Sequence, residues 1–212
     1  MHKVFDDLGI NSPKTLITSL VEFNDGDFPF PFLLKEIHSC ESKGLHKIEC
    51  IEDLKTFKDS LDSHNLTDVF LIQEILNIRR DLRVIVVGDK IVHYYWRINL
   101  SDHWRPTATS KGNIINFSNF PIIHNEIILN YVKKLKLSAA AFDIAWQNDN
   151  VNSDPIILEV SPAFSPNPLV TREFDLLNYG LYKKKVSIKG YDYNYVHLIF
   201  KIREEHLSYL NY

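Results

Sequence analysis

The 212-residue chain has few glycines and cysteines, no excess of basic residues and no long apolar run. Its 7 glycines form neither a Walker-type nor a Rossmann-type loop, which argues against those two phosphate-binding motifs. Its 2 cysteines, Cys40 and Cys50, have no metal-ligand spacing and argue for a reducing compartment rather than a disulfide framework. A run of about 18 apolar residues is absent, as is the apolar core of a signal peptide. We therefore expect a cytoplasmic protein that does not bind a membrane.

The charged residues are close to balanced, with 24 Lys and Arg against 27 Asp and Glu and a net charge of −3. The global basic field that is typical of nucleic-acid binding is missing, so we expect no nucleic-acid partner. The hydrophobic fraction of 45% and the charged fraction of 24% are those of an ordinary globular protein. The chain is long enough to bury a core as one large domain or two small ones.

Two short apolar runs each contain a single carboxylate. Residues 139–146 contain Asp143, and residues 156–161 contain Glu159. The polar, Asn- and Asp-rich residues 147–154 between them predict a hairpin connection. Carboxylates among small residues on one sheet face leave room for a cation. A divalent metal ion is the natural occupant of such a site.

Side-chain alternation along a strand places Asp143 on the same face as Ala141 and Ala145. Two ordinary interpretations remain open beside the metal site. Each acid could belong to the exposed half of an edge strand, or it could pair with a basic neighbour in the core.

The remaining patterns predict an α+β protein rather than a doubly wound sheet. The spacing of apolar residues and turn signals predicts strands at residues 32–37, 45–50 and 69–76, a helix from Glu52 onward, a hairpin of residues 82–87 and 91–98 joined by Gly88 and Asp89, and a helix at residues 125–137 with Asn125 as its N-cap.

Further residues have the chemistry that phosphate binding needs. Lys35 lies inside an apolar strand pattern, where a snorkelling lysine is the ordinary alternative. The turn that ends in Ser42-Lys43-Gly44 could close over a phosphate, although taken on its own it is better explained as an ordinary turn. Arginines supply planar, permanently charged donors for phosphate oxygens. Arg83 lies at the beginning of the central hairpin, and Arg97 and Arg105 come at the end of its second strand and after it. Taken singly, each arginine is as well explained as a surface charge.

Taken together, these segments resemble the ATP-grasp family, and most closely its ribosomal-protein glutamate ligase branch. The matching segments occur in the family's order over roughly residues 8 to 168, and they are Pro31-Phe-Leu-Leu-Lys35, Leu71-Ile-Gln-Glu-Ile75, Asp81-Leu-Arg-Val-Ile-Val-Val-Gly-Asp89, Trp104-Arg105, Phe142-Asp143-Ile144 and Leu158-Glu159-Val160-Ser161-Pro162. The resemblance implies an ATP-grasp fold, in which two α+β subdomains hold ATP between their antiparallel sheets. It places the smaller subdomain at residues 1–70, the larger at 71–180 and a C-terminal extension of unknown role at 181–212.

The resemblance also implies an activity, which is ATP-dependent formation of an amide bond between a carboxylate and an amine through an acyl phosphate. The carboxylate would come from a small molecule or a peptide. For the nucleotide, the resemblance implies that Lys35 contacts a phosphate, that Asp81 binds the ribose, and that the link between the subdomains faces the adenine with Gln73, Glu74, Ile75 and Leu76. It implies that the charge of the transferring phosphate is neutralised by Arg83, Arg97 and Arg105. It also implies that Mg²⁺ is bound by Asp143, Glu159 and Ser161. Two Mg²⁺ ions are implied, with Mn²⁺ as an alternative metal.

The sequence departs from the family pattern at several positions. Ser161 stands where the family has Asn, and Pro106-Thr107 stands where Arg105 would be followed by x-Asn. The phosphate loop is normally rich in glycine, whereas residues 38–44 contain Gly44 alone. Many members also carry an N-terminal α/β substrate domain. Either the chain is a stripped-down member or a fragment of the family, or a separate partner protein supplies that surface.

Two other functions remain open, and the departures motivate the second of them. The first is a kinase on the same fold, which would leave phosphate on a hydroxyl acceptor. The second is a catalytically weak or inactive module that binds ATP or a partner. Product analysis and a search for turnover distinguish both from a ligase.

Overall fold

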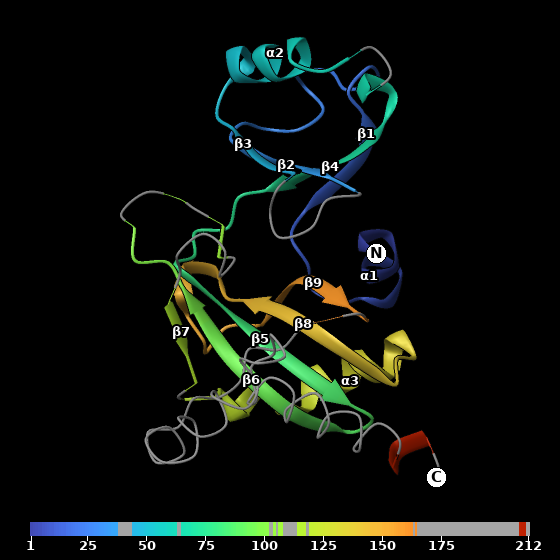
Figure 1. Ribbon diagram of the computed structural model, residues 1–212, viewed down its shortest axis with the longest axis vertical. Helices are drawn as coiled ribbons and strands as arrows, with labels where there is room; N and C mark the ends of the chain where they lie inside the picture. The colour runs from blue at the N-terminus through green and yellow to red at the C-terminus, as the bar shows by residue number, and fades with distance from the viewer. Residues whose placement is uncertain are drawn as a thin grey trace, which may run out of the picture. The chain divides into compact units, whose positions relative to one another are not determined.

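The computed structural model describes residues 1–37, 44–62, 65–101, 104, 106–107, 114–117, 119–162, 164 and 208–210. In this part of the chain the strands form one four-stranded and one five-stranded sheet (Figure 1). The chain divides into two compact units. The first comprises Met1–Arg80, Arg97–Ile114 and Ala145–Ile157. The second comprises Asp81–Trp96, Ile115–Ile144 and Leu158–Tyr212. No helix in the described residues is long and apolar enough to cross a membrane.

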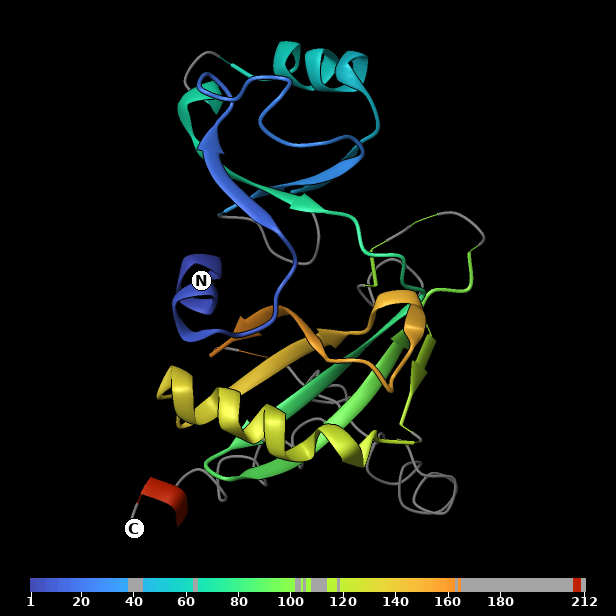
Figure 2. The same ribbon diagram turned by 180° about the vertical axis from the view of Figure 1, so that it is seen from behind.

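The four-stranded sheet has the order β1-β4-β2-β3, and its neighbouring strands are antiparallel. Its strands are β1 (Thr15–Ser19), β2 (Phe32–Glu36), β3 (Leu45–Ile48) and β4 (Val69–Glu74). Helix α2 (Ile51–Asp59) covers one face of this sheet (Figures 1 and 2). Phe32, Leu34 and Ile72 are fully buried in the same core cluster as Leu54 of α2. This face therefore contains the apolar half of the alternating pattern.

The opposite face of the four-stranded sheet carries polar side chains. Leu33 pairs with Gln73 and Lys35 pairs with Leu71, so Lys35 and Gln73 lie diagonally across β2 and β4 on one face. Helix α1 (His2–Leu8) lies on the side of the sheet away from α2 (Figures 1 and 2). Lys35 and Gln73, which are both expected to bind the nucleotide, therefore lie on the face that α2 does not cover.

The five-stranded sheet has the order β7-β6-β5-β8-β9. Its strands are β5 (Arg80–Val87), β6 (Lys90–Ile98), β7 (Ile114–Asn116), β8 (Ala139–Ala145) and β9 (Ile156–Ser161). Helix α3 (Asn125–Leu135) lies along one face (Figure 2), and its buried residues Ile128, Tyr131 and Val132 follow the helical repeat. Gly88, at φ +59° in the turn between β5 and β6, adopts a left-handed conformation that favours glycine.

Short 3₁₀ helices lie at η1 (Asn65–Thr67), η3 (Ile122–His124) and η4 (Gln147–Asp149). Every helix and strand that the sequence patterns predict is present within a few residues of its expected bounds. One prediction is wrong, because the N-cap of α3 is His124 rather than Asn125 and makes no side-chain capping bond. The 3₁₀ helix Ile122–His124 leads directly into α3 and leaves no room for a separate cap at Asn125. The sequence patterns did not reveal α1, β1 or β7.

Candidate functional site

Arg83 and Asp143 form the best-defined polar contact of the five-stranded sheet. They face each other directly across β5 and β8. Arg83 donates from Nε to Oδ1 and from Nη2 to Oδ2 of Asp143, both at 2.7 Å. The side chains are only 19% and 7% exposed, so the pair is largely shielded from water. A bidentate pair of this kind holds both planar groups in one orientation.

This contact settles the ordinary interpretations of Asp143. The edge-strand interpretation is wrong for this residue, because β8 lies between β5 and β9 and Asp143 is buried. Pairing with a basic neighbour is confirmed, and the neighbour is one of the arginines that the sequence singled out. The carboxylate is therefore held in place and its charge is offset by Arg83.

Glu159 and Ser161 lie on β9, at the end of the strand order. Glu159 is exposed, as expected for an acid on an edge strand. Side-chain alternation puts both residues on one face, and Ser161 Oγ donates a hydrogen bond of 3.0 Å to Glu159 Oε1. Ser161 thereby orients the carboxylate two residues before it.

The donor atoms of Asp143, Glu159 and Ser161 are all hard oxygens, which suit Mg²⁺. Arg83 donates to both carboxylate oxygens of Asp143, and each carboxylate oxygen can accept more than one contact. The described residues contain no cluster of three or more His, Cys, Asp or Glu side chains that would hold a metal alone. The residues therefore fit an ion that takes its other ligands from phosphate and water, the usual arrangement for Mg²⁺.

Two further charged candidates are buried. Asp81, at the start of β5, is 1% exposed, and Arg97, near the end of β6, is 8% exposed. Arg105 and residues 38–43 of the expected phosphate loop lie outside the described residues, so their predicted roles stay predictions. Gly44 is the one described residue of that loop, and its backbone carbonyl accepts a hydrogen bond of 2.9 Å from the backbone N–H of Glu36.

The segment expected to face the adenine is anchored by backbone and side-chain bonds. The backbone N–H of Lys14 donates to Glu74 Oε1 at 2.7 Å, and the backbone N–H of Glu74 donates to the carbonyl of Lys14 at 3.0 Å. Gln73 and Leu76 are buried, whereas Ile75 is half-buried. Glu74 therefore has one carboxylate oxygen already engaged by the main chain of Lys14.

Asp149, which the sequence analysis did not single out, binds the main chain at the start of β5. Asp149 accepts hydrogen bonds at 3.1 Å from the backbone N–H of Arg79 to both carboxylate oxygens, and another at 3.4 Å from the backbone N–H of Arg80. Asn148 joins the same stretch through its backbone N–H to the carbonyl of Asn77, at 2.9 Å. The Asn- and Asp-rich character of residues 147–154 is the sequence signal that accompanies this contact.

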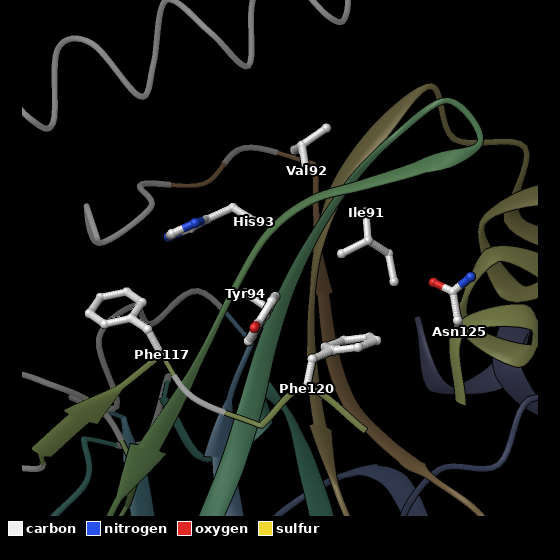
Figure 3. Close-up of a pocket in the computed structure, with 7 residues that line it drawn as sticks. All are labelled: Ile91, Val92, His93, Tyr94, Phe117, Phe120 and Asn125. Carbon is white, nitrogen blue, oxygen red and sulfur yellow. The ribbon is translucent and has the colours of Figure 1, made fainter. Parts of the chain in front are cut away.

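A separate pocket of about 340 Å³ lies beside β6 and the start of α3 (Figure 3). Its lining is mostly aromatic and apolar, with Ile91, Val92, His93, Tyr94, Phe117, Phe120 and Asn125. The rings of Tyr94 and Phe120 approach to 4.9 Å between centroids, and those of His93 and Phe117 to 5.9 Å. None of the candidate nucleotide or metal residues belongs to this pocket.

The four-stranded and the five-stranded sheet each agree with the ATP-grasp fold. The family model of the RimK-like ATP-grasp domain matches residues 2–166, and the chain belongs to that family. The expected family and fold class are thereby confirmed. A search among curated proteins found no match.

Solved structures agree on the fold. D-alanine–D-alanine ligase from Bacillus anthracis is 16% identical with a TM-score of 0.60, over 98% of this chain and 66% of that one. A RimK domain ATP-grasp protein from Sphaerobacter thermophilus is 11% identical with a TM-score of 0.56, over 98% and 64%. The ATP-grasp ligase PsnB, complexed with a minimal precursor, is 17% identical with a TM-score of 0.54, over 82% and 53%. The chain thus spans between about half and two thirds of the length of these proteins.

Proposed function

We propose that the chain is an ATP-dependent carboxylate–amine ligase that forms an amide bond through an acyl phosphate. The observation that carries this proposal is the contact between Arg83 and Asp143. It keeps together, in a largely buried position, a permanent cation suited to a transferring phosphoryl group and a carboxylate suited to the metal of ATP. Membership of the RimK-like ATP-grasp family supports the same chemistry.

The reaction has two steps. A carboxylate oxygen of the first substrate attacks the γ-phosphorus of ATP, the bond to the β-phosphate oxygen breaks, and ADP leaves with that electron pair. An amine then attacks the carbonyl carbon of the acyl phosphate, inorganic phosphate leaves, and the nitrogen gives up a proton. Negative charge on the transferring group is spread over its three equatorial oxygens, where a fixed arginine stabilises it.

Each candidate residue has a defined task in this scheme. Lys35 contacts a phosphate, Asp81 binds the ribose, and the residues from Gln73 to Leu76 position the adenine. Arg83 acts together with Arg97 and Arg105 on the phosphoryl group. Asp143, Glu159 and Ser161 would hold the Mg²⁺ of ATP, which would supply charge compensation on the phosphate oxygens. Two ions, or Mn²⁺ in place of Mg²⁺, are part of the proposal.

The substrates are proposed from the relatives. One is named as a ligase of D-alanine with D-alanine, and PsnB has been seen with its precursor peptide. A small-molecule or peptide carboxylate with a primary amine therefore defines the substrate class. We also propose a partner protein that contributes substrate-binding surface.

The proposal is tested by calorimetric titration of ATP with and without Mg²⁺, followed by a screen for ADP release with carboxylates and amines. We expect Mg²⁺ to tighten ATP binding in the wild-type chain, and Asp143→Asn or Glu159→Gln to weaken that dependence at least tenfold. Asp154→Asn, an exposed acid from the loop between β8 and β9, is the matched control and leaves binding unchanged. Unchanged Mg²⁺-ATP affinity in both site variants would remove the metal assignment.

One observation favours a second candidate, a nucleotide-binding module with little catalysis. Both oxygens of Asp143 accept bonds from Arg83, and a neutral hydroxyl at Ser161 stands in the third ligand position. Mg²⁺-dependent ATP binding without ADP release across the whole substrate panel would favour this module over the ligase. Phosphate left on a hydroxyl acceptor would instead indicate a kinase.

A further inference from the structure

His2 is a buried polar residue whose position neither the family match nor the sequence patterns explain. It is the first residue of α1, it is 3% exposed, and its ring packs edge-on against Phe5 at 5.5 Å between centroids. Its Nε2 lies 3.4 Å from Nε2 of Gln73. The imidazole thus lies on the face of the four-stranded sheet that α2 does not cover.

Hydrogen bonds of its neighbours determine which ring nitrogen of His2 carries the proton. The Thr15 hydroxyl donates its only hydrogen to the carbonyl of Pro13 at 2.7 Å. Thr15 Oγ1 must therefore accept from Gln73 Nε2, at 2.9 Å, which orients the amide of Gln73. The second hydrogen of that amide faces His2 Nε2, so Nε2 accepts and the proton of the neutral ring resides on Nδ1.

The Nδ1–H donor of His2 has no acceptor among the described residues, and its nitrogen is buried. Leaving a buried donor unsatisfied is costly, so the position calls for an acceptor atom. The ring is neutral near pH 7, so Nε2 keeps the lone pair with which it accepts from Gln73. Burial first, and then the charges of Lys35 and the N-terminal ammonium, lower the pKa of His2 to about 4, with Asp6 acting in the opposite direction.

The positive charge of Lys35 favours an anion as the acceptor for the Nδ1–H group of His2. Lys35 and Gln73 are diagonal neighbours on the same sheet face, and Gln73 contacts His2, so a cation and an unsatisfied N–H donor share one part of this face. A neutral acceptor would satisfy His2 alone. An anion satisfies the donor and interacts favourably with the lysine charge.

We infer that His2 is a second anion-binding side chain beside Lys35, and that its Nδ1–H donates to a phosphate oxygen of the bound nucleotide. This inference rests on the proposed function, because it takes the nucleotide as the anion. It adds to that function a phosphate contact supplied by the N-terminal helix.

Two variants of His2 separate the donor from the packing. In His2→Asn the side-chain amide nitrogen replaces Nδ1 as a donor, whereas in His2→Gln the amide reaches the Nε2 position and the Nδ1 donor is lost. Phe5→Leu is the matched control, since it loosens the packing around the ring and keeps the donor. All three variants remove buried volume near the same end of α1.

Calorimetry with ATP and Mg²⁺ is expected to give a dissociation constant about tenfold higher for His2→Gln than for the wild-type chain. His2→Asn and Phe5→Leu are expected to remain within about threefold of wild type. An NMR titration with adenosine, which lacks phosphate, is expected to give the same affinity for all four proteins. Equal ATP affinity of His2→Gln and wild type, or an equal loss in Phe5→Leu, would overturn the inference.

The ring itself provides a readout that packing does not affect. Nitrogen-15 NMR of the imidazole is expected to show the Nδ1–H tautomer in the free protein and a downfield shift of that proton on addition of ATP. An Nε2–H tautomer, or a proton unmoved by saturating ATP, would contradict the inference. If the wild-type chain fails to bind Mg²⁺-ATP at all, the proposed function falls together with it, whereas wild-type binding with an unaffected His2→Gln variant removes the role of His2 alone.

Discussion

Arg83 and Asp143 face each other across β5 and β8 and share two hydrogen bonds of 2.7 Å. The arginine is thereby fixed on the sheet before any ligand binds. The carboxylate keeps its charge in a buried position because the guanidinium compensates it. The pair thus holds two side chains of the five-stranded sheet in one orientation, and these are the two charges on which the proposed phosphoryl transfer depends.

Breaking this pair from the arginine side is expected to destabilise the fold. Arg83→Met leaves the Asp143 charge buried without its partner, and the free energy of unfolding should fall by about 3 kcal/mol. Urea denaturation at pH 7 measures the change. In the double variant Arg83→Met/Asp143→Leu both charges are gone, and most of the stability should return. A double variant as unstable as the single one would contradict this account of the pair.

Asp149 is expected to stabilise the stretch that joins β4 to β5. Asp149→Ala removes the acceptor for the backbone N–H groups of Arg79 and Arg80, and it places alanine at φ 53°, where a β-carbon is unfavourable. We expect a loss of about 2 kcal/mol in the free energy of unfolding and faster hydrogen exchange at these two amides.

The control for this prediction is Asp149→Asn. Asparagine keeps one acceptor oxygen and tolerates the left-handed conformation, so its loss should be less than half that of alanine. Equal losses in Asp149→Ala and Asp149→Asn would show that the carboxylate bonds do not determine the stability of this stretch.

Ser161 is expected to limit the affinity for the metal. Ser161→Asn retains a donor for Glu159 and adds an amide oxygen, which is a better ligand for Mg²⁺ than a neutral hydroxyl. We expect the Mg²⁺-dependent part of ATP affinity to rise about threefold to tenfold in Ser161→Asn and to fall in Ser161→Ala. Titration of Mg²⁺ at fixed ATP measures both. A weaker Ser161→Asn variant would place this side chain outside the metal site.

His2 predicts a specific dependence of stability on pH. Its pKa is about 4 in the folded chain, against an ordinary value of 6.5 when the chain is unfolded, so the unfolded chain binds more protons between these values. The neutral ring therefore contributes stability above pH 6.5 that is lost as the pH falls toward 4. Between pH 7 and 4.5 this loss should be about 2 to 3 kcal/mol.

His2→Phe removes the titrating group and isolates that contribution. The difference in free energy of unfolding between wild type and His2→Phe should shift by about 2 to 3 kcal/mol in favour of the variant when the pH is lowered from 7 to 4.5. Chemical denaturation at the two pH values provides the comparison. A difference that does not change with pH would mean that His2 titrates alike in the folded and unfolded chains.

Local sequence patterns were enough for the elements whose periodicity is strong. The apolar stripe of α3 and the Gly88-Asp89 turn each specify their structure within a few neighbouring residues. Helix α1 escaped notice because seven residues are too few to specify a helix by propensity, and its stability comes from tertiary packing of Phe5. The three-residue strand β7 is likewise too short to carry a pattern.

The sequence by itself determined which residues have the chemistry for Mg²⁺ and phosphate, because carboxylates, lysines and arginines stand out from apolar strands. Only the tertiary structure decided their partners. The pairing of Arg83 with Asp143 depends on the register of two strands about 60 residues apart in the chain, and the contact of His2 with Gln73 depends on where α1 docks. Such contacts are set by cooperative packing of distant segments, which no local pattern encodes.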